Sequence, residues 1–87
     1  MALLTESINQ LKLMADDIRT YNGDTYIYGQ YGVSKLIKWI DYSGTNKSYW
    51  KVYFFEKGEN VADESCKTKQ KQEAMHFALM WAVQGKI

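Results

Sequence analysis

The sequence has 87 residues and a formal net charge of +1, from 11 lysine and arginine residues against 10 aspartate and glutamate residues. This length fits a single domain, because a second domain would need a further ~50 residues or more. The near-neutral charge argues against a strongly basic nucleic-acid-binding module and against an acidic DNA mimic, while a hydrophobic content of 46% argues against disorder.

A helix is predicted near residues 4–21. Its apolar residues recur at intervals of four and three positions, which places them on one stripe of an amphipathic helix. They are Leu4, Ile8, Leu11, Ala15 and Ile18. Thr5 or Ser7 is a suitable cap for its start, and Asn22-Gly23 would end it because both residues tolerate a positive φ.

From Thr25 to Glu56 the hydrophobic period becomes two, and β-branched and aromatic residues dominate. This pattern predicts strands near 25–29, 34–42 and 48–56, with a short fourth strand near 60–64 as an option. The segments between the first three strands are short and contain glycine, which favours hairpins over crossover helices. We therefore expect an antiparallel meander.

The last predicted element is a helix near 68–84. The residues from Glu73 to Val83 favour a helix, Ser65 or Thr68 would provide its N-cap, and Gly85 would end it. Apolar residues surround most of the helix axis. This helix should therefore contact the sheet on one side and the first helix or a partner on the other.

These elements predict a single α+β domain over residues 1–87, with an N-terminal helix, a three- to four-stranded antiparallel meander and a C-terminal helix. Two helices can cover one face of such a sheet but not both, so both should lie mainly on one face. Trp50, Val52 and Phe54 share one side of the third predicted strand, and the alternate residues suit the open side better. The residues expected at a partner-binding site on the open face are Tyr26, Tyr28, Lys38, Tyr49, Lys51, Tyr53 and Phe55, which leaves Ile27 for the core.

This open face suits two kinds of partner. Tyrosines are common anchors of protein interfaces, and tyrosine combined with lysine can stack bases and neutralise phosphates. Aromatic cross-strand pairs also stabilise a sheet without any partner. Because the lysines look dispersed along the sequence and opposed by nearby acids, we favour a protein partner, with single-stranded or structured nucleic acid as the alternative.

Three lysines near the start of the final helix form a second candidate site, for an anion. They are Lys67, Lys69 and Lys71. The helix macrodipole makes positive charge at this position unfavourable by ~0.3–1 kcal/mol. Neutralisation by Asp63, Glu64 and Glu73 is the simplest explanation, and a bound phosphate or a carboxylate-rich protein surface is the alternative.

No constellation of residues specifies catalysis. His76 is the single histidine and has no second imidazole or thiolate at ligand spacing, so we expect no metal site. Cys66 lacks the surroundings of a nucleophile, and carboxylates such as Glu56 and Glu59 are expected to be solvated turn charges. We expect no catalytic residue, no cofactor and no enzymatic turnover.

The sequence also bears on location and assembly. A single cysteine cannot form an internal disulfide, and no apolar run approaches the ~18 residues of a membrane span. We therefore expect a cytoplasmic protein that makes no membrane contact. The surplus of apolar residues on the final helix and the exposed edges of the sheet leave a homodimer as an option.

The order of the predicted elements resembles that of small phage and prophage accessory proteins, including some anti-restriction and anti-CRISPR inhibitors. The resemblance concerns a helix, a three-stranded meander and a final helix, with Thr68-Lys69 opening the final helix and Glu73-Ala74 within it. It implies a non-catalytic protein-binding module that inhibits or modulates a host protein complex, such as a host defence complex. The excess of acidic residues found in the DNA-mimicking members of this group is missing here.

Overall fold

The computed structural model describes residues 2–40, 48–59, 62 and 64–86, and the side chains of residues 2–4 and 64 lie outside the description. Parts of the predicted strands near 34–42 and 60–64 therefore fall on residues that are not described. The elements are α1 (Ala2–Met14), β1 (Asp17–Tyr21), β2 (Asp24–Tyr28), β3 (Gly32–Ile40), β4 (Ser48–Glu56), β5 (Glu64–Thr68) and α2 (Lys71–Gln84).

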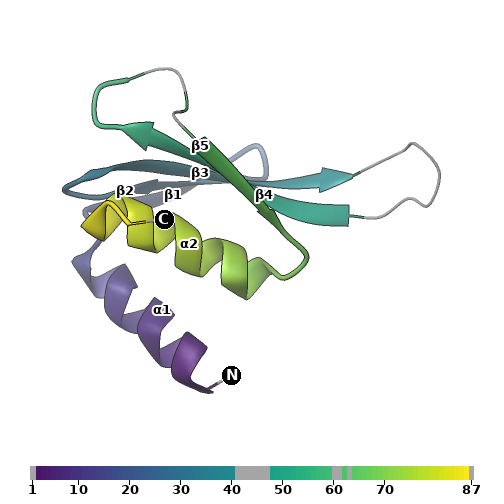
Figure 1. Cartoon of the computed structure of the whole chain (residues 1–87). Helices are drawn as coiled ribbons and strands as arrows, with labels where there is room; N and C mark the ends of the chain where they lie inside the picture. Colours follow the sequence, from purple (N-terminus) through teal and green to yellow (C-terminus); the bar gives the residue numbers. More distant parts are fainter. Residues whose placement is uncertain (1, 41–47, 60–61, 63, 87) are drawn as a thin grey trace.

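The strands form one antiparallel sheet in the order β1-β2-β3-β4-β5, so each strand pairs only with its neighbours in the chain. Both helices lie on the same side of this sheet (Figure 1). α2 packs directly against the strands, and α1 packs against α2. This architecture confirms the predicted α+β fold with terminal helices, an antiparallel meander and both helices on one side, but the described sheet has five strands instead of the predicted three or four.

The core lies between the sheet and α2. The strands contribute large apolar side chains, and α2 contributes alanines spaced four residues apart, which face the same direction on a helix. The buried strand residues are Ile27, Leu36, Val52 and Phe54, and the alanines are Ala74, Ala78 and Ala82; Leu79, Trp81 and Val83 of α2 and Ile8 and Leu11 of α1 complete the buried cluster. Because alanine has no side chain beyond Cβ, α2 can approach the strands closely.

Two polar side chains fix α2 at this short separation. The Ser34 hydroxyl, which is fully buried, donates a hydrogen bond of 2.7 Å to the carbonyl of Ala78. The indole N–H of Trp81 donates one of 2.9 Å to the carbonyl of Phe55. Each bond gives a buried polar group a partner and joins α2 to one of the two longest strands.

The predicted extent of the first helix is wrong at its C-terminal end. The helix ends at Met14, and residues 17–21 form the edge strand β1. Asn22 and Gly23 have φ angles of 52° and 83° and form the turn between β1 and β2. Two successive residues with positive φ match the right-handed twist of a hairpin, which is why Asn-Gly favours this turn as well as a helix end.

The caps of both helices differ in part from the prediction. α1 begins at Ala2, before Thr5 and Ser7. The strand β5 spans Glu64–Thr68 and overlaps the optional strand near 60–64 at Glu64, while residues 60, 61 and 63 of that prediction lie outside the described residues. The helix α2 begins at Lys71 after Gln70, which makes no side-chain cap bond. The C-terminal prediction is confirmed, because Gly85 has a φ of 70° and its N–H bonds to the carbonyl of Trp81 at 2.8 Å.

The first loop residue after β2 is required to be glycine by the approach of α2. A Cβ at Gly29 would overlap the carbonyl group of Ala82.

Neither helix among the described residues has the length and apolar composition needed to cross a membrane.

We predict that Gly29→Ala lowers the free energy of unfolding by about 3 kcal/mol, because the added methyl group must push α2 away from the sheet. Gly23→Ala is the matched control: it meets open space and introduces only the strain of a φ near 83°, about 1 kcal/mol. Urea denaturation measures both values. A Gly29→Ala protein as stable as the Gly23→Ala protein would contradict the close packing of α2.

Candidate functional site

The sheet has one face that neither helix covers, which we call the open face. Its positions alternate with the buried core positions and follow from the strand register. They are Asp17, Arg19 and Tyr21 of β1, Asp24, Tyr26 and Tyr28 of β2, Val33, Lys35, Ile37 and Trp39 of β3, Tyr49, Lys51, Tyr53 and Phe55 of β4, and Ser65 and Lys67 of β5. The predicted division of the third strand is confirmed, because Val52 and Phe54 are fully buried on the helix side.

The register brings together six of the seven residues predicted for the open face, and Ile27 lies in the core as expected. Lys38 is the exception. It pairs with Trp50, so its side chain belongs to the helix side of the sheet, with Nζ 6.0 Å from the centre of the Trp50 ring. The prediction for Lys38 was wrong because its side depends on where β3 begins, which the sequence pattern alone does not give.

The most distinctive part of the open face lies where β3, β4 and β5 run together. Trp39 pairs with Tyr49 across the strands, and their rings stack with centroids 6.1 Å apart and planes inclined by 29°. Trp39 keeps 43% of its surface exposed. Sequence reasoning missed Trp39; its period-two spacing from Lys35 and Ile37 would have placed it on the open face if Leu36 had been assigned to the core.

Two lysines flank these rings. Lys51 lies directly opposite Lys67 on the neighbouring strand. Lys67 Nζ is 4.7 Å from the ring centre of Tyr49 and 5.7 Å from that of Trp39. Lys51 Nζ is 5.0 Å from the ring centre of Tyr53 and 5.8 Å from that of Trp39. These separations fall within the range of cation–π attraction.

We call this group the platform: Trp39, Tyr49, Lys51, Tyr53 and Lys67. Like charges directly opposite on neighbouring strands destabilise a sheet. None of the described open-face positions of β4 or β5 is acidic, so the rings are the only described groups on these strands that offset the two charges. The platform is therefore a cationic, aromatic surface that would be stabilised by an anion.

The opposite part of the open face has balanced charges. Arg19 of β1 donates a hydrogen bond to Asp17 at 2.5 Å, which raises the pKa of the guanidinium group further. Lys35 lies 3.9 Å from the carboxylate of Asp24. The positive charge within the described part of the face is therefore concentrated toward β4 and β5.

The three lysines predicted as an anion site are separated by the sheet. Lys67 lies on the platform, whereas Lys71 is the first residue of α2 and places its Nζ 5.4 Å from the ring centre of Trp50, on the helix side. Lys69 lies between β5 and α2 and is exposed. Glu73 accepts a hydrogen bond of 2.6 Å from Thr68. Asp63 and the side chain of Glu64 lie outside the described residues.

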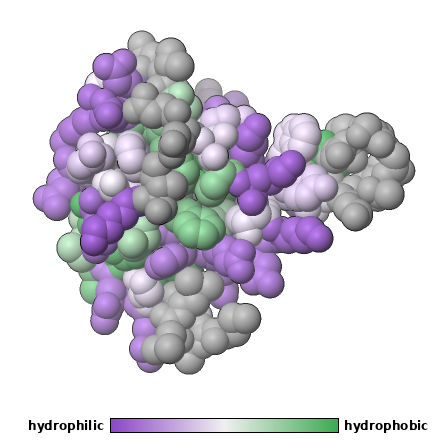
Figure 2. All heavy atoms as spheres, in the orientation of Figure 1, coloured by the Kyte–Doolittle hydropathy of each residue, from purple (hydrophilic) through white to green (hydrophobic). Residues whose placement is uncertain are grey.

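The end of β3 and β4 therefore carries lysines around aromatic rings on both sides of the sheet. In the space-filling view the described residues at this end are mainly pale and purple, whereas most of the green, apolar residues lie nearer the centre (Figure 2). A ligand that reached the platform would meet amphipathic rings and cations, with the half-buried Ile37 beside them opposite Lys51.

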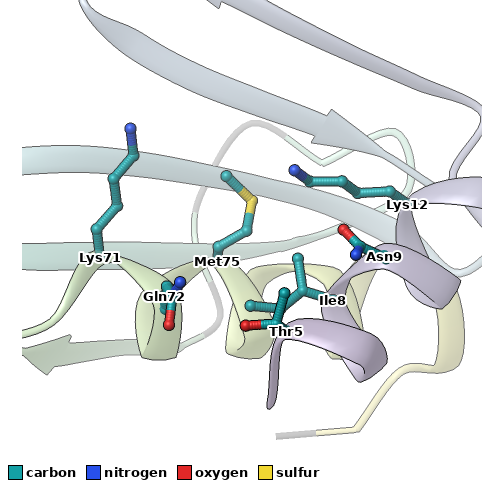
Figure 3. Close-up of a pocket in the computed structure, with 7 residues that line it drawn as sticks. All are labelled: Thr5, Ile8, Asn9, Lys12, Lys71, Gln72 and Met75. Carbon is teal, nitrogen blue, oxygen red and sulfur yellow. The ribbon is translucent and has the colours of Figure 1, made fainter. Parts of the chain in front are cut away.

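Two hollows lie outside the platform. One, of about 270 Å³, is on the open face and is lined by Tyr26, Tyr28, Val33, Phe55 and Glu59. The other, of about 230 Å³, lies between the helices. Figure 3 shows that Lys12 projects from α1 and Lys71 from α2 at this second hollow, with Ile8 and Met75 between them.

The groups considered for nucleophilic chemistry lie in different surroundings. Cys66 belongs to β5 and is opposite Val52 on the helix side, where burial raises the pKa of its thiol. His76 of α2 lies with its Nε2 3.2 Å from the hydroxyl of Ser7 in α1. Among the described residues, His76 therefore has a structural contact between the two helices rather than a contact with the thiol.

Comparisons of the chain with protein families, with curated proteins and with solved structures found no match.

We predict that Cys66 reacts slowly with a thiol reagent at pH 8 in the folded protein and at least tenfold faster in urea, because burial disfavours its thiolate.

The raised pKa of the Cys66 thiol in the folded state also makes the stability of the protein depend on pH. The unfolded thiol loses its proton first, so stability is complete below about pH 8.5 and falls as the pH rises above it. Absorbance of the thiol product that the reagent releases measures the rate of reaction. Urea titrations at pH 7 and pH 10 measure the loss of stability, which Cys66→Ser should reduce. Equal rates of reaction with and without urea would contradict the burial.

Proposed function

We propose that the protein is a non-catalytic module that binds single-stranded nucleic acid on the platform. The observation that carries the proposal is the stacked pair of Trp39 and Tyr49 with two lysines facing each other beside it. Proteins that bind single strands combine ring faces on which bases stack with cations that neutralise the phosphates. The platform supplies both groups on neighbouring strands.

The energies of the competing contacts favour exchange of lysine for a base. A cation–π contact at an exposed site is worth about 0.5–1 kcal/mol, whereas a base stacked on an aromatic side chain contributes about 1–3 kcal/mol. Lys51 and Lys67 have long flexible side chains, so each can leave a ring and remain close to it. A bound strand would then place bases on the rings and phosphates between the two ammonium groups.

The shape of the site favours a single strand over a duplex. The rings lie on the face of a sheet, and the bases of a duplex present only their edges to such a surface. Trp39 and Tyr49 could therefore stack only on bases that are not paired. A duplex would use the lysines alone.

The arrangement of the lysines favours nucleic acid over a protein, the partner that we favoured from the sequence. The sequence favours a protein partner because its lysines look dispersed, yet the register places Lys51 opposite Lys67. Repulsion between them favours a ligand with closely spaced negative charges, and phosphates of one strand provide such spacing. An acidic protein surface is the partner to consider if nucleic acid fails to bind.

Several expectations from the sequence remain part of the proposal. They are the absence of enzymatic turnover, the cytoplasmic location and the origin of the protein as a phage-type inhibitor of a host complex. A homodimer would be compatible with the proposal, because the platform is confined to β3, β4 and β5 and leaves the edge strand β1 available for pairing.

We predict that Trp39→Val/Tyr49→Val weakens binding of a fluorescent 12-nucleotide DNA or RNA single strand by at least tenfold, because at least one base can no longer stack. Valine also favours β-strand structure but has no aromatic ring on which a base could stack. Leu13→Ala is the control, since Leu13 is exposed on α1, on the helix side of the sheet. Fluorescence anisotropy measures binding, and circular dichroism checks folding. Wild-type protein that binds neither strand at low salt would overturn the proposed function.

We further predict that the affinity falls steeply with salt and that Lys51→Gln/Lys67→Gln makes this dependence shallower. The slope of log K against log salt should decrease in magnitude by about 0.7 for each phosphate that is no longer neutralised. Lys12→Gln, on the helix side, removes one of the two charges that the double variant loses without touching the platform, and it should leave the slope almost unchanged. Anisotropy titrations between 50 and 300 mM salt, chosen as roughly the range in which such slopes are large, measure it. An unchanged slope in the double variant would place the phosphates elsewhere.

A further inference from the structure

The hollow on the open face is built differently from the platform. Its described walls are the aromatic rings of Tyr26, Tyr28 and Phe55 with the aliphatic side chain of Val33, and the one carboxylate among the described lining residues belongs to Glu59. Among the described residues no lysine or arginine lines it, and Lys35 Nζ is 5.6 Å from the centre of the Tyr26 ring. A phosphate would be repelled by the carboxylate, so the hollow suits an uncharged, flat group that donates hydrogen bonds.

A tight turn places Glu59 at this hollow. β4 ends at Glu56, and the N–H of Glu59 donates a hydrogen bond of 3.0 Å back to the carbonyl of Glu56. Gly58 has a φ of 88°, which an L-residue rarely adopts, and allows the chain to reverse. The backbone of Glu59 is therefore held beside the end of β4.

We propose that this hollow receives a guanine base of the strand bound on the platform, with the Glu59 carboxylate accepting hydrogen bonds from the base. The proposal rests on the proposed function. Guanine is the base whose pairing edge presents two adjacent donors, the ring N1–H and the exocyclic amino group. A carboxylate has two acceptor oxygens and can accept both donors at once.

The other bases fit this chemistry less well. Adenine and cytosine each pair an amino donor with a ring-nitrogen acceptor, and that acceptor would face the second carboxylate oxygen. Thymine and uracil offer one N–H between two carbonyl oxygens, both of which Glu59 would repel. The aromatic walls stack on any base, so the hydrogen bonds to Glu59 decide the preference.

One bound nucleic-acid strand can reach both the hollow and the platform. Tyr49 of the platform and Phe55 of the hollow lie on the same face of β4, six residues apart, which corresponds to about 20 Å. Tyr53, which belongs to the platform, lies between them on the same face. A short single strand lying along β4 could therefore stack on Trp39 and Tyr49 and also place a base beside Glu59.

The experiment compares 12-nucleotide thymine strands in which a single position is thymine, guanine, inosine or adenine, using fluorescence anisotropy with the wild-type protein and with Glu59→Gln. Inosine keeps the N1–H of guanine and lacks its amino group. We expect the guanine strand to bind about tenfold more tightly than the all-thymine strand, with inosine intermediate and adenine close to thymine. Placing the substituted base at several positions in turn covers every register that the strand can adopt.

In Glu59→Gln, one of the two acceptors becomes a donor while the size of the side chain is kept. We expect the guanine preference to fall below about threefold, while binding of the all-thymine strand stays unchanged or becomes slightly tighter. Glu59 is exposed at a turn, so this variant should fold normally.

The outcomes separate this inference from the proposed function. Equal binding of all four strands, together with weaker binding by Trp39→Val/Tyr49→Val, would overturn the guanine site and leave the platform in place. A guanine preference that persists in Glu59→Gln would also overturn the role of Glu59. Failure of the wild-type protein to bind any strand would overturn both proposals.

Discussion

The contact between α2 and the sheet determines the rest of the structure. Alanines at positions 74, 78 and 82 bring the helix backbone close to the strands, and the buried hydrogen bond from Ser34 to Ala78 requires that closeness. The opposite side of α2 then accepts α1. Because both helices are committed to one side, the other side of the sheet has no cover within the described chain (Figure 1).

The alternation of the strands converts this packing into a functional surface. Each buried residue on β3 and β4 fixes the direction of its neighbours, so burial of Leu36 and Val52 places Ile37 and Lys51 on the open face. The registers with β3 and β5 then align Trp39 with Tyr49 and Lys51 with Lys67. The charge repulsion at the platform is thus a direct result of how β5 pairs, and it identifies a surface suited to negative charge in a chain that is almost neutral overall.

The fold class, the burial of Ile27 and most of the open face could be predicted from the sequence. The alternation of apolar and polar residues within a strand can be recognised without knowing which strands pair with each other. The sequence was not sufficient for β1. Ile18 continues the helical spacing of Leu11 and Ala15, and Asn22-Gly23 is compatible with a helix end as well as a hairpin turn. The decisive property is the pairing of Ile18 with Ile27, which depends on a residue outside the segment.

The candidate site shows the same limit. Tyr49 and Lys51 could be assigned to one face from their spacing within a single strand. The side of Lys38, the contribution of Trp39 and the position of Lys67 opposite Lys51 depend on registers between strands, and these are set by turn geometry and core packing together. The position of Glu59 beside Phe55 depends on a turn closed by one backbone hydrogen bond.

The placement of α1 has a consequence for local unfolding. Among the described elements, the close backbone contacts of α1 are all with α2, and its described apolar anchors are Ile8 and Leu11. Full burial of two such side chains is worth about 3–6 kcal/mol, less than the combined contacts that hold α2 and the central strands. α1 can therefore separate from the molecule while the sheet and α2 stay joined, so opening of this helix need not alter the open face.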